Sequence, residues 1–123
     1  MNPPTHLKQD QPRPFPTADG KTILEHLGHF NGFAQLSVAH MLAPPGWSEP
    51  PQTPEFDEVT LMVRGRKRVE VDGKTVTLEA GQSLWVRRGA RVRYANPFDE
   101  PAEYWSVCLP AFSPETVHRE ASP

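Results

Sequence analysis

The sequence predicts an all-β domain. Fifteen prolines and eight glycines in 123 residues, with a hydrophobic fraction of 37%, are typical of short strands joined by many turns. About seven apolar segments follow one another with turn signals every eight to twelve residues, which indicates a β-sandwich or a small barrel. The helix-strand alternation that would indicate a parallel sheet is missing. A chain of this length forms one domain and buries roughly two thirds of its unfolded surface.

We divide the chain into a proline-rich arm (residues 1–20), a barrel domain (residues 21–112) and a C-terminal tail (residues 113–123). The arm contains five prolines and four other apolar side chains, so it adds little to a core. Residues 21–31 fit either a short helical turn or an edge strand. The tail is again rich in proline and polar residues, and it either packs across the barrel or frays.

The first long strand is expected from Phe33 to Leu42. Residues 47–57 then form a loop, because prolines 50, 51 and 54 interrupt a regular ladder, and such loops often carry a site. Glu58 opens the next strand and Gly65 closes it. The Asp72-Gly73 pair is the strongest hairpin signal, because a type I′ turn requires positive φ at both positions. Further strands are expected at residues 67–71, 74–80, 84–87, 92–94 and 102–109.

The net charge and the cysteine content limit the classes of partner and the cellular compartment that we expect. A formal charge of -2 argues against a nucleic-acid binder, although residues 64–93 carry +6 and the remainder -8. That basic segment is either a set of solvated strand faces or a rim that attracts an anionic small molecule. Cys108 is the single cysteine, so no internal disulfide can form and a reducing cytoplasm is expected. Neither a signal-peptide core nor an apolar run of about 20 residues is present, so no membrane association is expected.

Two stretches, residues 50–65 and 81–96, resemble the two signature motifs of the cupin superfamily, whose members are small jelly-roll barrels. The residues in register with those motifs are Glu58, Gly65, Gly81, Gly89 and Asn96. Arg87 stands at the usual proline position. The resemblance covers about residues 33–109 and implies a cupin-type double-stranded β-helix (jelly-roll barrel) with an extended N-terminal arm. Residues 47–58 and 107–120 are also similar to a subgroup of small stand-alone cupins.

The positions that hold a metal in cupins depart from the family pattern. Metal-binding cupins use three histidines and one glutamate, and the corresponding residues here are Gln52, Pro54, Val92 and Glu58. Proline and valine have no side-chain donor, and an amide oxygen is a weak, hard ligand. The usual metal site is therefore not expected, and neither is an organic cofactor. An alternative keeps a divalent metal on unusual ligands, drawn from Glu58, Gln52 and His40, with Glu49, Glu55, Asp57 and His118 as further candidates.

Without that metal, the two motif strands outline a mostly apolar pocket. Thr60 and Met62 share a face with Glu58, and Val92 and Tyr94 lie on the strand across the barrel. Apolar walls with a few polar groups are the usual makeup of a small-molecule site. Glu58 suits proton transfer in such a pocket, and its plain alternative is a carboxylate paired with an inward arginine.

Two functions of different classes stay open. The first is a protein that binds a small molecule of unknown identity, and the second is an isomerase, epimerase or lyase. In the enzyme, Glu58 acts as acid or base, and Gln52, Tyr94 or His118 orients a carbonyl or carboxylate substrate. The ligand-contacting candidates are Gln52, Thr60, Met62, Val92 and His40.

Further expectations concern the two candidate histidines and the outer face of the strand that begins at Glu58. His40 shares a face with Leu36 and Val38, which we expect to be buried, either as a hydrogen-bonded core histidine or as a ligand. His118 is either an exposed tail residue or a cap over the barrel mouth. The strand that begins at Glu58 also has an apolar opposite face, which needs cover. We therefore expect a homodimer, with the N-terminal arm able to lie across the partner.

Overall fold

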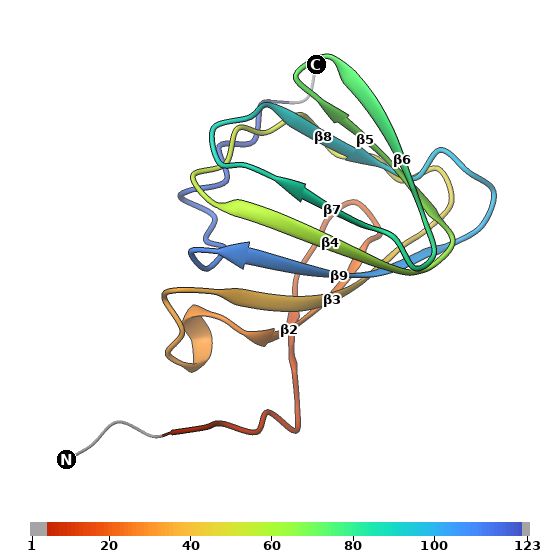
Figure 1. Ribbon diagram of the computed structural model, residues 1–123. Coiled ribbons are helices and arrows are strands. Elements are labelled where there is room, and N and C mark those ends of the chain that lie inside the picture. Colours follow the sequence, from red (N-terminus) through yellow and green to blue (C-terminus); the bar gives the residue numbers. More distant parts are fainter. Residues whose placement is uncertain (1–4, 122–123) are drawn as a thin grey trace.

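The computed structural model describes residues 5–121, which form nine strands and one short 3-10 helix. The chain is drawn in Figure 1. The elements are β1 (Arg13–Phe15), β2 (Thr22–Leu27), η1 (His29–Asn31), β3 (Ser37–Ala43), β4 (Asp57–Arg64), β5 (Arg66–Val71), β6 (Lys74–Glu79), β7 (Ser83–Val86), β8 (Val92–Ala95) and β9 (Ala102–Leu109). In this part of the chain, no helix is long and apolar enough to cross a membrane.

The strands form two antiparallel sheets that face each other. The larger sheet has six strands in the order β1-β2-β3-β9-β4-β7, and the smaller has three in the order β6-β5-β8. Figure 1 shows β5, β6 and β8 lying above β4, β7 and β9. Every pairing between the named strands is antiparallel. This is the jelly-roll barrel that the sequence predicts.

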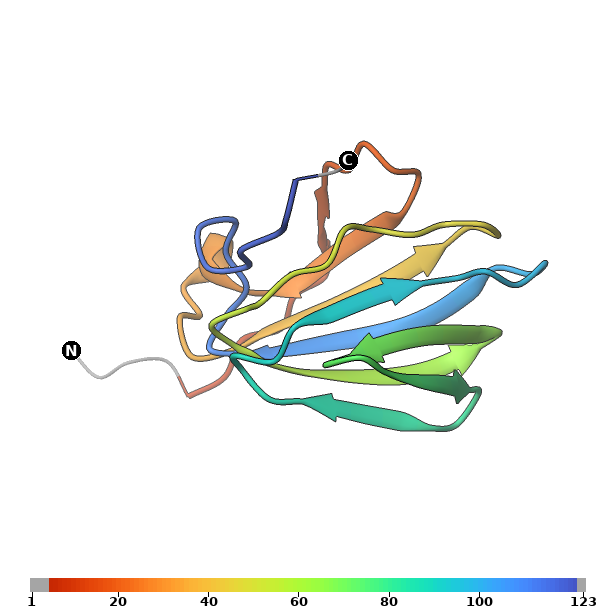
Figure 2. The ribbon, with the colours of Figure 1, turned by 90° about the horizontal axis from the view of Figure 1, so that it is seen from above.

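The proline-rich loop and the C-terminal tail extend the smaller sheet. Ser48 pairs with Ala95, and Gln52 pairs with both Val92 and Arg119. Backbone hydrogen bonds from Thr53 to His118 and from Glu120 to Pro51 continue this pairing. Figure 2 shows the loop as the yellow trace running alongside the long strands. The tail therefore packs against the barrel, which was one of the two outcomes expected for it.

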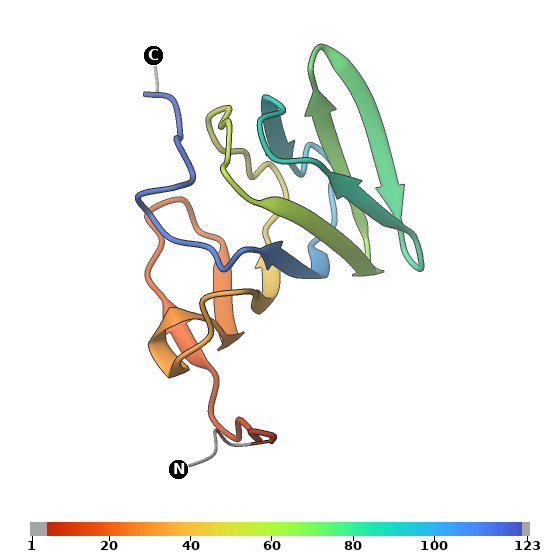
Figure 3. The same ribbon diagram turned by 60° about the vertical axis from the view of Figure 1, so that its left-hand side comes forward.

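The arm also packs against its own barrel. β1 pairs with β2 at the edge of the larger sheet, and Phe15 stacks edge-on against Phe112 with ring centroids 5.6 Å apart. Figure 3 shows the residues just after β1 and the C-terminal tail on the same side of the molecule. Residues of the arm before the expected boundary at residue 20 thus contact residues of the barrel after it. Residues 1–4 of the arm lie outside the described part of the chain.

The motif glycine and asparagine have structural roles. Gly65 has a φ of 75°, and a Cβ built on it would lie 2.2 Å from the carbonyl oxygen of Pro101, so no larger residue fits. Asn96 is fully buried, and its Nδ2 donates to the carbonyl oxygens of Ala43, Pro44 and Glu100. These contacts tie the turn after β8 to the turn after β3. The register shared with cupins therefore reflects the needs of the barrel backbone.

Most strand boundaries follow the sequence, with two differences. β4 and β9 begin and end within one residue of expectation, and Asp72-Gly73 forms the expected turn with φ values of 47° and 83°. β3 begins at Ser37 rather than Phe33, because the preceding residues form the turn after η1. Residues 21–31 contain both candidate elements, first β2 and then η1.

The expected buried face of β3 is wrong. Ser37 and Ala39 are buried, whereas Val38 and His40 lie on the outer face and are half-buried. His40 Nε2 contacts Glu103 Oε2 at 2.8 Å, and its ring packs against Trp105 on the same outer face. The strand carries apolar residues on both faces, so its composition alone does not distinguish the side that the second sheet covers.

Candidate functional site

A cavity of about 330 Å³ lies between the two sheets at the side where the arm and tail approach the barrel. Its walls come from β2, β3, β4, β5, β8 and β9. Residues 15–19 of the arm, Glu49, Pro50 and Gln52 of the loop, and Phe112 and Arg119 of the tail also line it. The other half of the barrel interior is filled by a packed apolar cluster that includes Met62, Val69 and Tyr104. The cavity therefore occupies one end of the barrel.

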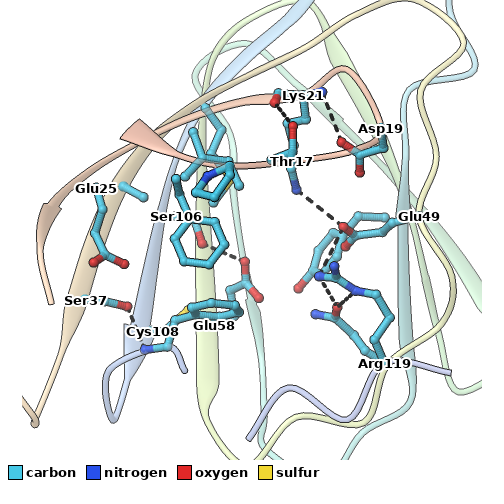
Figure 4. A pocket seen from close by; sticks show the side chains of 18 of the residues that line it. Thr17, Asp19, Lys21, Glu25, Ser37, Glu49, Glu58, Ser106, Cys108 and Arg119 are labelled. Atoms are coloured by element: carbon cyan, nitrogen blue, oxygen red, sulfur yellow. Dashed lines mark hydrogen bonds and ion pairs between the residues drawn. The ribbon is translucent and has the colours of Figure 1, made fainter. Parts of the chain in front are cut away.

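A carboxylate and a hydroxyl meet on the floor of this cavity. Glu58 projects inward from β4, and the Ser106 hydroxyl of the neighbouring β9 donates to its Oε2 at 2.6 Å (Figure 4). Cys108, opposite Glu58 in the ladder, also lines the cavity. Burial raises the pKa of the Cys108 thiol well above its ordinary value, and the charge of Glu58 adds to this effect. Cys108 is thus a neutral thiol beside a hydrogen-bonded carboxylate.

A buried lysine lies in the same cavity. Lys67 extends inward from β5 and is 2% exposed, with its Nζ 3.7 Å from the ring centre of Tyr104 and 4.2 Å from that of Tyr94. Burial lowers the pKa of Lys67 from 10.5 to about 7, although the negative charge of Glu58 partly offsets this shift. Such a shift corresponds to ~5 kcal/mol of cost for the charged form. Both the charged and the neutral form of the amine are therefore populated near neutral pH.

Two tyrosine hydroxyls beside Lys67 have no hydrogen-bond partner. Tyr94 and Tyr104 are 2% and 0% exposed, and among the described residues nothing accepts from or donates to either hydroxyl. Burial raises the pKa of both phenols well above the ordinary value, so both are neutral donors. An unpaired buried hydroxyl costs about 1–3 kcal/mol. Tyr94 lines the cavity, so a bound oxygen atom would supply a partner for it.

Charged groups also gather where the arm, loop and tail meet. Glu49 is 5% exposed, and its Oε2 lies 3.3 Å from Lys21 Nζ and 3.5 Å from the Arg119 guanidinium. Arg119 also donates to Gln52 Oε1 at 3.1 and 3.3 Å. Lys21 packs over the Trp47 ring at 4.4 Å. Figure 4 shows Glu49 between the two basic side chains, which close this side of the cavity.

Comparison with known proteins settles the family. The family model described as "Cupin domain" matches residues 39–108, which is more than half of the chain. The chain belongs to the cupin family. This assignment agrees with the jelly-roll topology and with the motif positions held by Glu58, Gly65 and Asn96.

Solved structures share this cupin fold at low sequence identity. The polyketide cyclase RemF from Streptomyces resistomycificus has a TM-score of 0.75 with 14% identity, covering 96% of this chain and 87% of that one. An RmlC-like cupin from Shewanella frigidimarina has a TM-score of 0.71 with 19% identity, covering 89% and 93%. KdgF from Halomonas has a TM-score of 0.70 with 14% identity, covering 82% and 88%. These similarities concern the fold alone.

One curated relative is closer in sequence. The chain is 48% identical over 106 residues to a protein named endoribonuclease YbeY from Myxococcus xanthus (strain DK1622). The match covers 85% of this chain but 36% of that protein. The cupin therefore spans about a third of the length of this relative.

The usual cupin metal ligands do not fit the residues present. Gln52 is buried, but its Oε1 accepts from Arg119, and the buried Pro54 and Val92 offer no donor. Between residues 5 and 121, no three His, Cys, Asp or Glu side chains come together as a metal site. The alternative set of Glu58, Gln52 and His40 does not assemble, because His40 lies on the outer face of β3.

The structure brings together three of the candidate site residues and separates the others. Glu58, Gln52 and Tyr94 line the cavity. Thr60, Met62 and Val92 face the barrel interior as expected, but they lie in its packed part and do not line the cavity. His40 is outside the barrel, and His118 points away from the mouth to contact Glu55. His118 has a φ of 48°, and the residue that reaches the cavity from the tail is its neighbour Arg119.

The three loop carboxylates that were further candidates for a metal lie in different environments. Glu55 is exposed, and Asp57 is paired with Arg88 at 3.1 Å outside the cavity. Glu49, by contrast, is buried at the cavity wall. Strand alternation could have found one further residue, since Lys67 shares the inward face of Val69 on β5. The roles of Lys21, Ser106 and Arg119 depend on long-range contacts that the sequence does not show.

Replacing Lys67 with methionine is expected to change how stability depends on pH. The folded protein loses the Lys67 proton near pH 7, whereas the unfolded chain keeps it up to about 10.5. Between these values the unfolded state binds more protons, so the free energy of unfolding of the wild type rises with pH, by up to about 1.4 kcal/mol per unit. Below pH 7 both states are protonated and the full cost of the buried charge is present.

Urea unfolding from about pH 6 to pH 9 should therefore show Lys67→Met as the more stable protein at low pH, with the difference shrinking above pH 7. Lys74→Met, at an exposed lysine, is the matched control and should give a constant difference from the wild type. Parallel curves for Lys67→Met and wild type would contradict the buried charge.

Proposed function

We propose that this cupin binds a small organic molecule in the cavity beside Glu58, without the usual three-histidine metal site. The observation that carries the proposal is the cavity of about 330 Å³ that Glu58 and Lys67 line. Its volume is at the lower end of the range for small-molecule pockets, about 300–1,000 Å³. Apolar walls from Phe56, Ile23 and Met41 surround the polar groups, which is the usual composition of such a site.

The polar groups indicate the chemistry of the ligand. Lys67 and the Tyr94 hydroxyl both donate, and neither has a hydrogen-bond acceptor among the residues described. A carbonyl or carboxylate oxygen placed between them would accept from both. The proposed ligand is therefore a small compound with an oxo or carboxylate group and an apolar remainder.

A second candidate function is an acid-base enzyme that uses Glu58. The observation that favours it is that the Ser106 hydroxyl donates to Glu58 Oε2, which fixes the carboxylate in the cavity. Glu58 also influences the pKa of Lys67, so the cavity holds an acid and a base within electrostatic reach. Such pairs suit proton removal next to a carbonyl, as in isomerases, epimerases and some lyases. Tyr94 would orient the carbonyl oxygen, whereas His118 and His40 lie too far outside to take part.

The proposal also includes a second copy of this chain as partner. Leu61, Val63 and Trp85 are 44%, 42% and 58% exposed on the outer face of the larger sheet. Val59 pairs with Trp85, and Leu61 pairs with Trp105, so these side chains form one surface. The neighbouring charges are already paired within the chain, Arg64 with Glu103 and Arg88 with Asp57. Two copies could therefore meet on this surface without like-charge repulsion, as a two-fold interface requires.

Other partners do not enter the proposal. The net charge of -2 does not favour nucleic acid. A cytoplasmic location fits the single buried cysteine, which a reducing compartment keeps as a thiol.

Blocking the cavity mouth should weaken binding. Ala18 is exposed and lines the cavity, so Ala18→Trp fills the entrance without disturbing the core, and Ala80→Trp in an exposed turn is the control. Saturation-transfer NMR with pyruvate, acetoacetate and benzoate should detect binding of at least one probe to the wild type and to Ala80→Trp. We expect Ala18→Trp to weaken that binding roughly tenfold or more. Equal binding by both variants, or no binding to the wild type, would contradict the proposal.

Removing the Glu58 charge should separate binding from catalysis. If Glu58 transfers protons, wild-type protein will catalyse exchange of the pyruvate methyl protons in D₂O, and Glu58→Gln will slow this exchange by about a hundredfold or more. Pyruvate binding should persist in this variant, and Glu79→Gln, at an exposed glutamate, should behave as wild type. Exchange that is equal in wild type and Glu58→Gln would leave binding as the function of the cavity.

Breaking the outer apolar surface should give monomers. Light scattering at micromolar concentration should report a dimer mass for the wild type and for Ala80→Glu. The double variant Leu61→Lys with Trp85→Glu should report a monomer mass, because burying those charges in the interface is costly. A monomeric wild type would contradict the dimer.

A further inference from the structure

We propose that Lys67 forms an imine with the carbonyl carbon of an aldehyde or ketone bound in the cavity. This inference rests on the proposed binding of a small oxo compound, and it adds a covalent step that binding alone does not require. It also assigns the reactive atom to Lys67 Nζ rather than to the motif residue Glu58.

The position of Lys67 is unlike that of a structural lysine. Its side chain is enclosed by the rings of Tyr94 and Tyr104, and no carboxylate of the described chain lies within ion-pair distance of Nζ. Lys21, at the rim of the same cavity, instead pairs with Glu49 at 3.3 Å. A buried ammonium without a paired carboxylate is costly. The neutral form of Lys67, which is the nucleophilic form, is therefore favoured at this position.

The electrostatics of the cavity support nucleophilic attack. Burial lowers the pKa of Lys67 to about 7, so a substantial fraction of the molecules carries a neutral amine at neutral pH. An exposed lysine, with a pKa of about 10.4, offers far less than one per cent of neutral amine under the same conditions. The tyrosine rings restrict the side chain, and the cavity keeps the reacting carbon near it.

The reaction balances without any further reagent. The lone pair of Lys67 Nζ attacks the carbonyl carbon, and the oxygen takes up the proton that the nitrogen loses, which gives a carbinolamine. The Glu58 carboxylate takes up the proton that the Lys67 ammonium gives up when it becomes a neutral amine. It then passes this proton to the leaving hydroxyl, and the nitrogen lone pair forms the C=N bond as water departs. One ketone and one lysine ammonium thus become one protonated imine and one water, and the Glu58 carboxylate is left to accept a proton from the adjacent carbon.

The cavity has the polar groups that these steps use. Tyr94 lines it with a free hydroxyl that can donate to the carbonyl oxygen during attack. Ser106 holds one oxygen of Glu58, which leaves the other available for proton transfer. Neither Cys108 nor Lys21 competes as the nucleophile, because burial raises the pKa of the Cys108 thiol and Lys21 is ion-paired.

The test uses pentane-2,4-dione, a small diketone that converts a neutral lysine into a stable enaminone with loss of one water. Full-length protein is incubated with it over a series of pH values, and peptide mass mapping locates the adduct. We expect one rapid adduct on Lys67, with a rate that is half-maximal near pH 7. Lys74→Met should retain this adduct, and Lys67→Met should lack it while keeping the far-ultraviolet circular dichroism of the wild type.

Two results would overturn the inference. One is an unmodified Lys67 in wild-type protein that still binds pyruvate in the NMR experiment, which would reject the imine and leave the binding proposal standing. The other is modification of Lys67 at the same rate and with the same pH profile as the exposed lysines. Loss of both the adduct and the NMR signal in Ala18→Trp, with both retained in Ala80→Trp, would support the covalent step and the binding site together.

Discussion

The alternation of side chains along each strand is the constraint on which this barrel depends. Inward residues of the two sheets must fill the space between them, and at one end they do so with apolar side chains such as Met62 and Val69. At the other end the inward residues include Glu58 and Lys67, and the space between them stays open. One strand can therefore serve both the core and the site, as β4 does with Met62 and Glu58.

Enclosure gives the polar groups of the cavity their chemical character. Lys67 is surrounded by tyrosine rings, so its charged form is penalised, and the tyrosine and cysteine side chains beside it stay neutral. The same residues on an exposed strand would have ordinary properties. The arm and the tail are part of this enclosure, because Lys21 and Arg119 converge on Glu49 at the cavity wall.

The cupin motif contains positions that shape the backbone and positions that hold a metal. In this cupin the first are kept and the second are replaced. Gly65 and Asn96 are needed by the backbone of the barrel. Gly65 allows the close approach of Pro101, and Asn96 bridges two turns. The metal-holding positions have other residues, and one of them, Gln52, takes part in the tail contact through Arg119. The backbone requirements of a barrel can thus persist while the chemistry of its interior changes.

Turn residues and strand alternation are local properties, and by themselves they indicated a β-sandwich or a small barrel. The resemblance of the motif residues Glu58, Gly65 and Asn96 to those of cupins then implied the jelly-roll barrel. It also placed Glu58, Gln52 and Tyr94 near one another through the register of the cupin motifs. Only the tertiary structure decided which face of β3 is covered, and with it the exclusion of His40. It alone placed Lys67, Lys21 and Arg119 at one cavity, because their meeting depends on how distant segments pack.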